Sequence, residues 1–232
     1  LNGDNPAILY GYGGFCEIQQ PHFWNYVYSW IQKGGVYAQA FIRGGCELGK
    51  EWHTSAIKKN KEKSFDDFHF AMKYLIDNKY SKPERLGISG TSNGGLLTSL
   101  MTVRYPNLFK AAFVGSALTD MLNFHKKSDS WRFWVPEYGD PNNENDRIFI
   151  NKFSPFENIK EDSYPSILIK AGVNDERVPI FHSLKYFRKL KDNNRSNNPI
   201  LLLVEKNTGH SSWTNPEVIW AFFYRELALQ GL

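Results

Sequence analysis

A serine stands among glycines in the stretch Gly90-Thr91-Ser92-Asn93-Gly94-Gly95. A short apolar run that ends at Ile88 precedes it, and leucines at helical spacing follow it. Gly-x-Ser-x-Gly at a strand-to-helix turn is typical of a nucleophile elbow, where the glycines allow a sharp turn and the serine hydroxyl is exposed above a sheet. The motif also occurs by chance in ordinary turns. Its chemistry therefore depends on which other residues the fold brings to Ser92.

A serine nucleophile needs a general base and an acidic residue that orients this base. His210 follows a continuous apolar run at residues 200–204, and Asp175 follows the preceding apolar run at residues 166–171. The chain order serine, aspartate, histidine is that of α/β-hydrolases and differs from the orders in chymotrypsin and subtilisin. We therefore predict that Ser92, Asp175 and His210 form a catalytic triad.

Other acidic and basic residues compete for these roles. His182 falls inside a predicted helix and His125 inside a long irregular segment, so neither follows a strand. Asp120 follows an earlier strand than Asp175 does, and we expect it to cap the segment after it. These positions favour Asp175 and His210 over the alternatives.

Acyl transfer also requires two hydrogen-bond donors for the oxyanion near the nucleophile. The backbone N–H of Asn93, directly after Ser92, is the first candidate. The second should come from the glycine-rich loop at residues 11–15, which follows the first predicted strand. In this loop Tyr12 is either a hydroxyl donor or an aromatic wall.

Short apolar runs alternate with amphipathic helical patterns along most of the chain. The expected strands lie at residues 7–10, 36–42, 85–88, 111–115, 166–171 and 200–204, and the expected helices at residues 24–32, 65–75, 96–103, 180–190 and 216–229. Ser64 is placed to cap the second helix, and residues 121–158 are expected to form an irregular cap or binding loop. The alternation predicts an α/β fold, with a mainly parallel sheet flanked by helices and ligand chemistry at the carboxyl ends of the strands.

The composition is that of one globular domain. The chain has 232 residues, with 28 Lys and Arg against 24 Asp and Glu, which gives a net charge of +4. Its charges are scattered except for a basic patch at residues 58–63, which we interpret as a solvated loop. No broad basic face with aromatic residues is evident, so we expect no nucleic-acid partner.

The cysteines and the N-terminus bear on the expected compartment. Cys16 and Cys46 lie in different segments without Cys-x-x-Cys spacing, so the sequence indicates neither a disulfide framework nor a zinc site. Residues 1–6 lack the features of a signal peptide, and no apolar stretch reaches the roughly eighteen residues of a membrane span. We expect a soluble, cytoplasmic protein with no membrane partner, no metal and no organic cofactor.

Short motifs are spread over essentially the whole chain. They are Tyr10-Gly11-Tyr12-Gly13-Gly14-Phe15, Arg43-Gly44-Gly45, Glu47-Leu48-Gly49, Trp52-His53, Phe65-Asp66-Asp67-Phe68, Gly90-Thr91-Ser92-Asn93-Gly94-Gly95-Leu96-Leu97, Asp120-Met121-Leu122-Asn123-Phe124-His125-Lys126 and Asp175-Glu176-Arg177-Val178-Pro179. Together they resemble the catalytic α/β-hydrolase domain of the prolyl oligopeptidase family, serine peptidase family S9.

The resemblance implies the same triad and an oxyanion hole made by the Tyr12 hydroxyl and the Asn93 N–H. It also implies a proline pocket from Phe15, Leu118, Trp134, Tyr138 and Val178, with Trp134 stacked on the proline ring and Arg177 bound to a substrate carbonyl. Since proline has no N–H, shape and flat aromatic contact must select it. We therefore expect a serine oligopeptidase that cleaves short peptides after proline through an acyl-enzyme, unless Trp134 and Tyr138 only pack within their segment.

Three other functions stay open. Glu137 and residues 43–49 also resemble oligopeptidase B-like enzymes, whose acidic groups accept basic residues. Hydrolysis of small esters is a second alternative within the enzyme class, and an inactive hydrolase fold that only binds partners is an alternative of another class. The resemblance further implies a β-propeller and N-terminal edge strands that residues 1–232 lack, so we expect one hydrolase domain that is a piece of a longer parent architecture.

Overall fold

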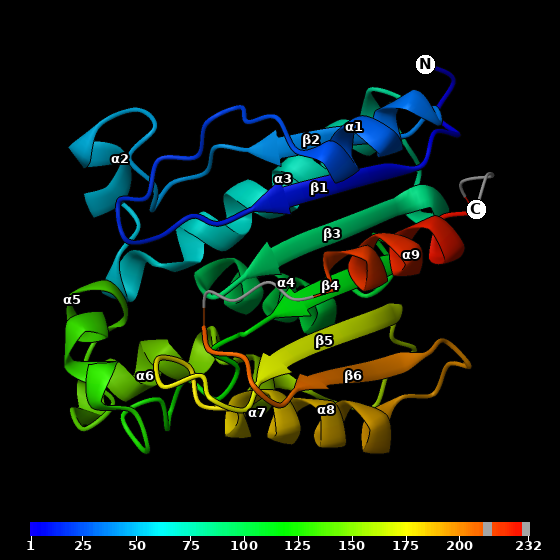
Figure 1. The fold of residues 1–232 in the computed structure, drawn as a ribbon. Coiled ribbons are helices and arrows are strands. Elements are labelled where there is room, and N and C mark those ends of the chain that lie inside the picture. Colours follow the sequence, from blue (N-terminus) through cyan, green and yellow to red (C-terminus); the bar gives the residue numbers. More distant parts are fainter. Residues whose placement is uncertain (211–214, 229–232) are drawn as a thin grey trace.

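The chain folds around a parallel β-sheet in a computed structural model that describes residues 1–210 and 215–228 (Figure 1). The described residues form six strands in the order β2-β1-β3-β4-β5-β6, and every neighbouring pair is parallel. The strands are β1 (Ala7–Gly11), β2 (Val36–Ala40), β3 (Leu86–Thr91), β4 (Ala111–Gly115), β5 (Ser166–Gly172) and β6 (Ile200–Glu205). The predicted α/β-hydrolase sheet is confirmed.

Helices cover both faces of this sheet (Figure 1). The larger apolar cluster joins one face of the sheet to α3 (Glu62–Asp77), α4 (Asn93–Arg104) and α8 (Phe181–Asn193). A smaller cluster joins the other face to α1 (Asn25–Gln32) and α9 (Pro216–Glu226), where Trp30 and Phe223 are almost fully buried. The central strands are therefore shielded from water on both faces, as their continuous apolar runs require. The last expected helix ends beyond the described residues.

The strand order changes direction between β1 and β3. After β1 the chain adds β2 on one side, and it then returns past β1 to place β3 on the other side. The loops after β1 and β3 consequently leave the same edge of the sheet in opposite directions. In open parallel sheets such a point leaves a crevice for ligands.

The segment expected to be an irregular cap is mostly helical. It contains the 3-10 helix η3 (Asp129–Trp134) and three short α-helices, α5 (Val135–Tyr138), α6 (Glu144–Lys152) and α7 (Pro155–Asn158). Together with α2 (Lys50–Thr54), helices α5 and α6 lie beyond the carboxyl ends of the central strands (Figure 1). Helices of four to nine residues leave too short a periodic pattern to be detected in the sequence.

Two expectations about residues 58–64 are corrected, one at Ser64 and one at Lys61, while Lys58 and Lys59 are exposed as expected. Helix α3 begins at Glu62, and Ser64 lies inside it, where its hydroxyl donates to the carbonyl oxygen of Arg43 at 2.7 Å. Lys61, between the 3-10 helix η1 (Lys58–Asn60) and α3, is fully buried instead of solvated. Ser64 contacts the loop after β2, whereas Lys61 contacts Gly13 in the loop after β1 and Glu137 on α5. Local sequence cannot reveal these distant neighbours.

An apolar groove of about 470 Å³ lies between α1, α9 and the sheet. It is lined by side chains such as Tyr10, Tyr37 and Trp220. The exposed side chain of Trp24, just before α1, also lines it. No helix among the described residues has the length and apolar character needed to cross a membrane.

Cys16 and Cys46 form a disulfide, which the sequence did not indicate. Their Cα atoms are 4.5 Å apart, although 30 positions separate them in the chain. Parallel strands β1 and β2 end at the same edge of the sheet, so the loops that follow them meet there. The structure therefore corrects the interpretation that no disulfide is indicated, and the cysteines no longer support a reducing compartment.

Replacing both Cys16 and Cys46 by serine should lower the free energy of unfolding by about 3 kcal/mol, because a cross-link over 30 positions restricts the unfolded chain. Urea unfolding of the wild type and of the double variant measures this difference. Wild-type protein in excess reductant should match the variant, and the variant should not respond to reductant. Identical unfolding midpoints for the oxidised wild type and the variant would contradict the prediction.

Candidate active site

Ser92 lies at a strained turn between β3 and α4. Its backbone has φ 60° and ψ −117°, in a region that non-glycine residues rarely adopt. The chain approaches itself closely here, because a Cβ atom at Gly94 would lie 2.5 Å from the carbonyl oxygen of Gly11, and one at Gly90 would overlap the Gly94 carbonyl. The Ser92 N–H donates to the carbonyl oxygen of Gly115 on β4 at 2.8 Å. These contacts hold the serine in the geometry of a nucleophile elbow.

The three predicted triad residues meet at the carboxyl ends of the strands. His210 Nε2 is 3.0 Å from Ser92 Oγ, and His210 Nδ1 is 2.8 Å from Asp175 Oδ2. The other carboxylate oxygen, Asp175 Oδ1, accepts the N–H groups of Arg177 at 3.1 Å and Val178 at 2.7 Å. The Asp175 side chain is 1% exposed and that of His210 is 12% exposed. This arrangement can orient the imidazole so that Nε2 accepts a proton from the serine.

Tyr12 and Asn93, the predicted oxyanion donors, lie beside Ser92. Asn93 is the first residue of α4, so its N–H has no acceptor within the helix. Burial raises the pKa of Tyr12 to about 12, and its interaction with the Ser92 side chain opposes this shift. The Tyr12 hydroxyl therefore stays protonated beside Ser92 and can donate a hydrogen bond at neutral pH.

The expected proline-pocket residues share one apolar cluster. Phe15 contacts Tyr138 edge to face with ring centroids 5.4 Å apart. Phe124, which the sequence did not single out for the pocket, contacts Trp134 at 5.8 Å and Tyr138 at 6.0 Å. The buried members of the cluster include Leu118, Trp134, Tyr138 and Val178.

Trp134, predicted to stack on the proline ring, and Tyr138, predicted to line the pocket, expose little of their surface. Trp134 is 6% exposed and Tyr138 is fully buried, so packing accounts for much of their surface. The Tyr138 hydroxyl donates to Asn93 Oδ1 at 2.7 Å. Arg177 is exposed, and its carbonyl oxygen accepts the Ser128 hydroxyl at 3.0 Å. The structure thus brings the expected residues to one region, in which Arg177 is exposed and Phe15 is partly buried.

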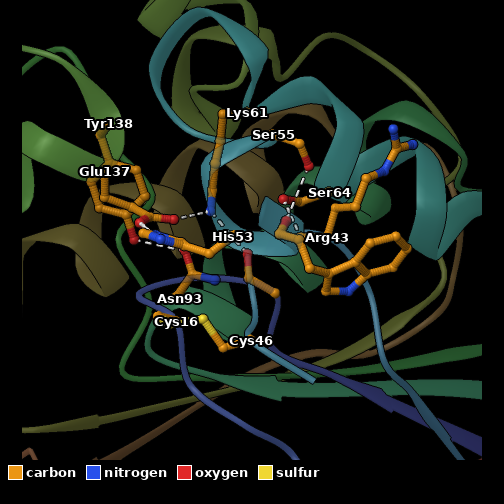
Figure 2. A network of polar contacts seen from close by, with 12 residues as sticks. Cys16, Arg43, Cys46, His53, Ser55, Lys61, Ser64, Asn93, Glu137 and Tyr138 are labelled. Carbon is orange, nitrogen blue, oxygen red and sulfur yellow. Dashed lines mark hydrogen bonds and ion pairs between the residues drawn. A yellow bond between two sulfur atoms is a disulfide. The ribbon is translucent and has the colours of Figure 1, made fainter. Parts of the chain in front are cut away.

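Glu137 is not a free acidic group. It is 3% exposed, and its Oε1 accepts from Lys61 Nζ at 2.5 Å while its Oε2 lies 2.7 Å from His53 Nε2 (Figure 2). Sequence reasoning missed Lys61 and His53, because nothing in their own segments indicates a buried partner. A carboxylate that is buried and already pairs through both oxygens is poorly placed to receive a basic substrate side chain.

The rejected candidates have other partners. His182 is fully buried, its Nδ1 accepts the Asp120 N–H at 3.2 Å, and burial lowers its pKa to about 3. Asp120 pairs with Lys185 and also accepts the Asn123 side-chain amide at 2.8 Å. Burial likewise lowers the pKa of His125. Within residues 1–210 and 215–228 no three potential His, Cys, Asp or Glu ligands gather as a metal site would require.

The chain is similar to known peptidases along most of its length. The profile of the prolyl oligopeptidase family, Peptidase_S9, matches residues 21–228. The chain is 37% identical over 222 residues to a prolyl endopeptidase of Elizabethkingia meningoseptica, covering 95% of this chain and 31% of that protein. It is 39% identical over 216 residues to prolyl oligopeptidase A of Galerina marginata, covering 91% of this chain and 29% of that protein.

A solved structure from a study of two prolyl endopeptidases matches the fold with a TM-score of 0.94 at 34% identity, over 99% of this chain and 35% of that chain. The chain thus spans about a third of the length of the relatives it matches.

Burial of a neutral His182 should make the protein less stable in mild acid. Its pKa is about 3 when folded against 6.5 normally, so between these values only the unfolded chain binds the proton. The contribution of neutral His182 to the free energy of unfolding is complete above pH 6.5. Below this value it decreases by at most about 1.4 kcal/mol for each unit by which the pH is lowered.

Urea unfolding at several pH values between 7 and 4 tests this. The variant His182→Gln should lose less stability on acidification than the wild type, and His22→Gln, at an exposed histidine, should behave like the wild type. Equal slopes for His182→Gln and the wild type would show that His182 does not cause the acid sensitivity.

Proposed function

The chain belongs to the prolyl oligopeptidase family of serine peptidases, and on that premise we propose that it cleaves short peptides on the carboxyl side of proline through an acyl-enzyme. The observation that carries this proposal is the hydrogen-bonded chain from Ser92 through His210 to the buried carboxylate of Asp175. A nucleophile, a base and an orienting acid in this geometry are what acyl transfer requires. We also propose that residues 1–232 form one catalytic domain.

In the proposed mechanism Ser92 Oγ attacks the substrate carbonyl carbon while His210 Nε2 takes the serine proton. The negative oxygen that forms accepts hydrogen bonds from the Tyr12 hydroxyl and the Asn93 N–H. His210 then gives its proton to the leaving amine, the peptide bond breaks, and an acyl ester remains on Ser92. A water molecule attacks this ester in the same way, releasing the peptide acid and restoring the serine.

The preference for proline draws support from the character of the surrounding side chains. Phe15 and the cluster behind it are apolar and aromatic, which suits a ring that has no N–H to recognise. The rival preference for basic residues needs an available carboxylate. Glu137 already pairs with Lys61 and His53, so a guanidinium entering here would lack a counter-ion.

Ser92→Ala should abolish covalent labelling by a fluorophosphonate and lower kcat/KM for peptides by about four orders of magnitude or more, since no other side chain in the triad can form the acyl ester. Labelling followed by mass spectrometry of the modified peptide measures this. Ser89→Ala, three residues earlier on β3, should label like the wild type. Failure of folded wild-type protein to label at Ser92 would refute the hydrolase function and favour a binding role.

A blocked Gly-Pro fluorogenic substrate should be cleaved with a kcat/KM at least about a hundredfold above that of the matching Arg substrate, because an unpaired guanidinium is costly to desolvate. Initial rates over a range of substrate concentrations give both values, with Ser92→Ala as the background. Faster cleavage of the Arg substrate would overturn the proline preference, and rapid turnover of a simple ester alone would favour the esterase alternative.

A further inference from the structure

Lys61 is a fully buried lysine that bridges two parts of the site. Its Nζ donates to Glu137 Oε1 at 2.5 Å and to the carbonyl oxygen of Gly13 at 2.9 Å (Figure 2). Burial lowers the pKa of Lys61, and the Glu137 carboxylate opposes this shift. Buried ion pairs seldom stabilise a fold more than apolar residues of the same size would. The location of this pair is therefore a better guide to its role than its contribution to stability.

Gly13 and Glu137, the two partners of Lys61, are each next in the chain to a tyrosine. One tyrosine is a proposed oxyanion donor, and the other bonds to the side chain of the second donor residue. Gly13 directly follows Tyr12, and Glu137 directly precedes Tyr138. The Tyr138 hydroxyl donates to Asn93 Oδ1 at 2.7 Å, and Asn93 Nδ2 donates to the Tyr12 carbonyl oxygen at 2.5 Å.

These contacts close a ring that runs from Lys61 through Gly13 and Tyr12 to Asn93, and back through Tyr138 and Glu137 to Lys61. In Figure 2 the Asn93 side chain lies below the Lys61–Glu137 contact.

We propose that Lys61 and Glu137 are positioning residues, whose buried pair sets where the Tyr12 hydroxyl and the Asn93 N–H point relative to Ser92. The inference rests on the proposed function, since it concerns the donors of that site. Oxyanion donors act only if their position is set before the charge develops. Gly13 has φ 65°, a conformation that costs glycine little, so the loop that carries Tyr12 needs an external tether to keep one geometry.

Lys61 and Glu137 could instead serve only to join the segment before α3 to α5. In that case the loss of activity in a variant would follow the loss of stability. Single substitutions do not separate the two roles, because each leaves a buried charge without its partner. The double substitution Lys61→Met with Glu137→Gln removes both charges and still breaks the tether to Gly13.

The double variant should be more stable than either single variant and yet keep a low kcat. We expect kcat for the Gly-Pro substrate to fall by about tenfold to a hundredfold with KM within about threefold of the wild type, because the donors act on the transition state. Lys59→Met, at an exposed lysine of the same basic segment, is the matched control and should retain wild-type kinetics. A folded double variant with wild-type kcat would overturn the inference.

Tyr138→Phe opens the ring at a second point without removing a charge. This variant should also lower kcat, and it provides a test of the inference if the Lys61 variants do not fold. An unchanged kcat in Tyr138→Phe would contradict the link through Asn93.

Crystal structures of the wild type and the double variant give a readout that needs no catalysis. A shift of the Tyr12 hydroxyl away from Ser92 in the variant supports the inference, and an unchanged position refutes it. This result stands even if the wild type fails to label at Ser92, which would refute the proposed function alone.

Discussion

The close approach of the end of β1 to the start of α4 is the constraint on which the rest of the site depends. A Cβ atom at Gly94 would lie 2.5 Å from the Gly11 carbonyl oxygen, so the start of α4 and the end of β1 can meet only if this position is glycine. That contact places the loop carrying Tyr12 beside Ser92 and Asn93. It follows from the strand order, because β1 and β3 are neighbours and their loops diverge from one edge of the sheet.

Several polar groups around this turn are buried, and the charged ones among them have partners. Asp175 accepts three hydrogen bonds, from His210 and from two backbone N–H groups. Lys61 and Glu137 neutralise each other, and the amide of Asn93 is engaged at both its oxygen and its nitrogen. Groups held this way keep one orientation in a low-dielectric setting, which is the condition for stabilising charge as it develops in a reaction. The same burial explains why His182 is a neutral structural histidine and not a base.

The sequence patterns that predicted structure correctly were those repeated over several residues or confined to one turn. Continuous apolar runs located the six strands, and the Gly-x-Ser-x-Gly turn located the elbow. Patterns whose outcome depends on a residue far away in the chain did not predict the structure correctly. Ser64 resembles a helix cap but bonds to Arg43, and the short helices of residues 121–158 have no periodic signal of their own. Cys16 and Cys46 pair because two parallel strands end together, a proximity that the spacing of the cysteines does not contain.

The sequence by itself determined the kind of fold, the order in which serine, aspartate and histidine leave the strands, and the family resemblance that motifs such as Asp175-Glu176-Arg177-Val178-Pro179 carry. These features are local or depend on chain order, so they can be recognised from the sequence alone. Only the tertiary structure decided that the lysine of a charged run is buried, and that Glu137 is neutralised by partners from another segment. A charge is buried or solvated according to what packs over it, and residues far away in the chain supply that covering.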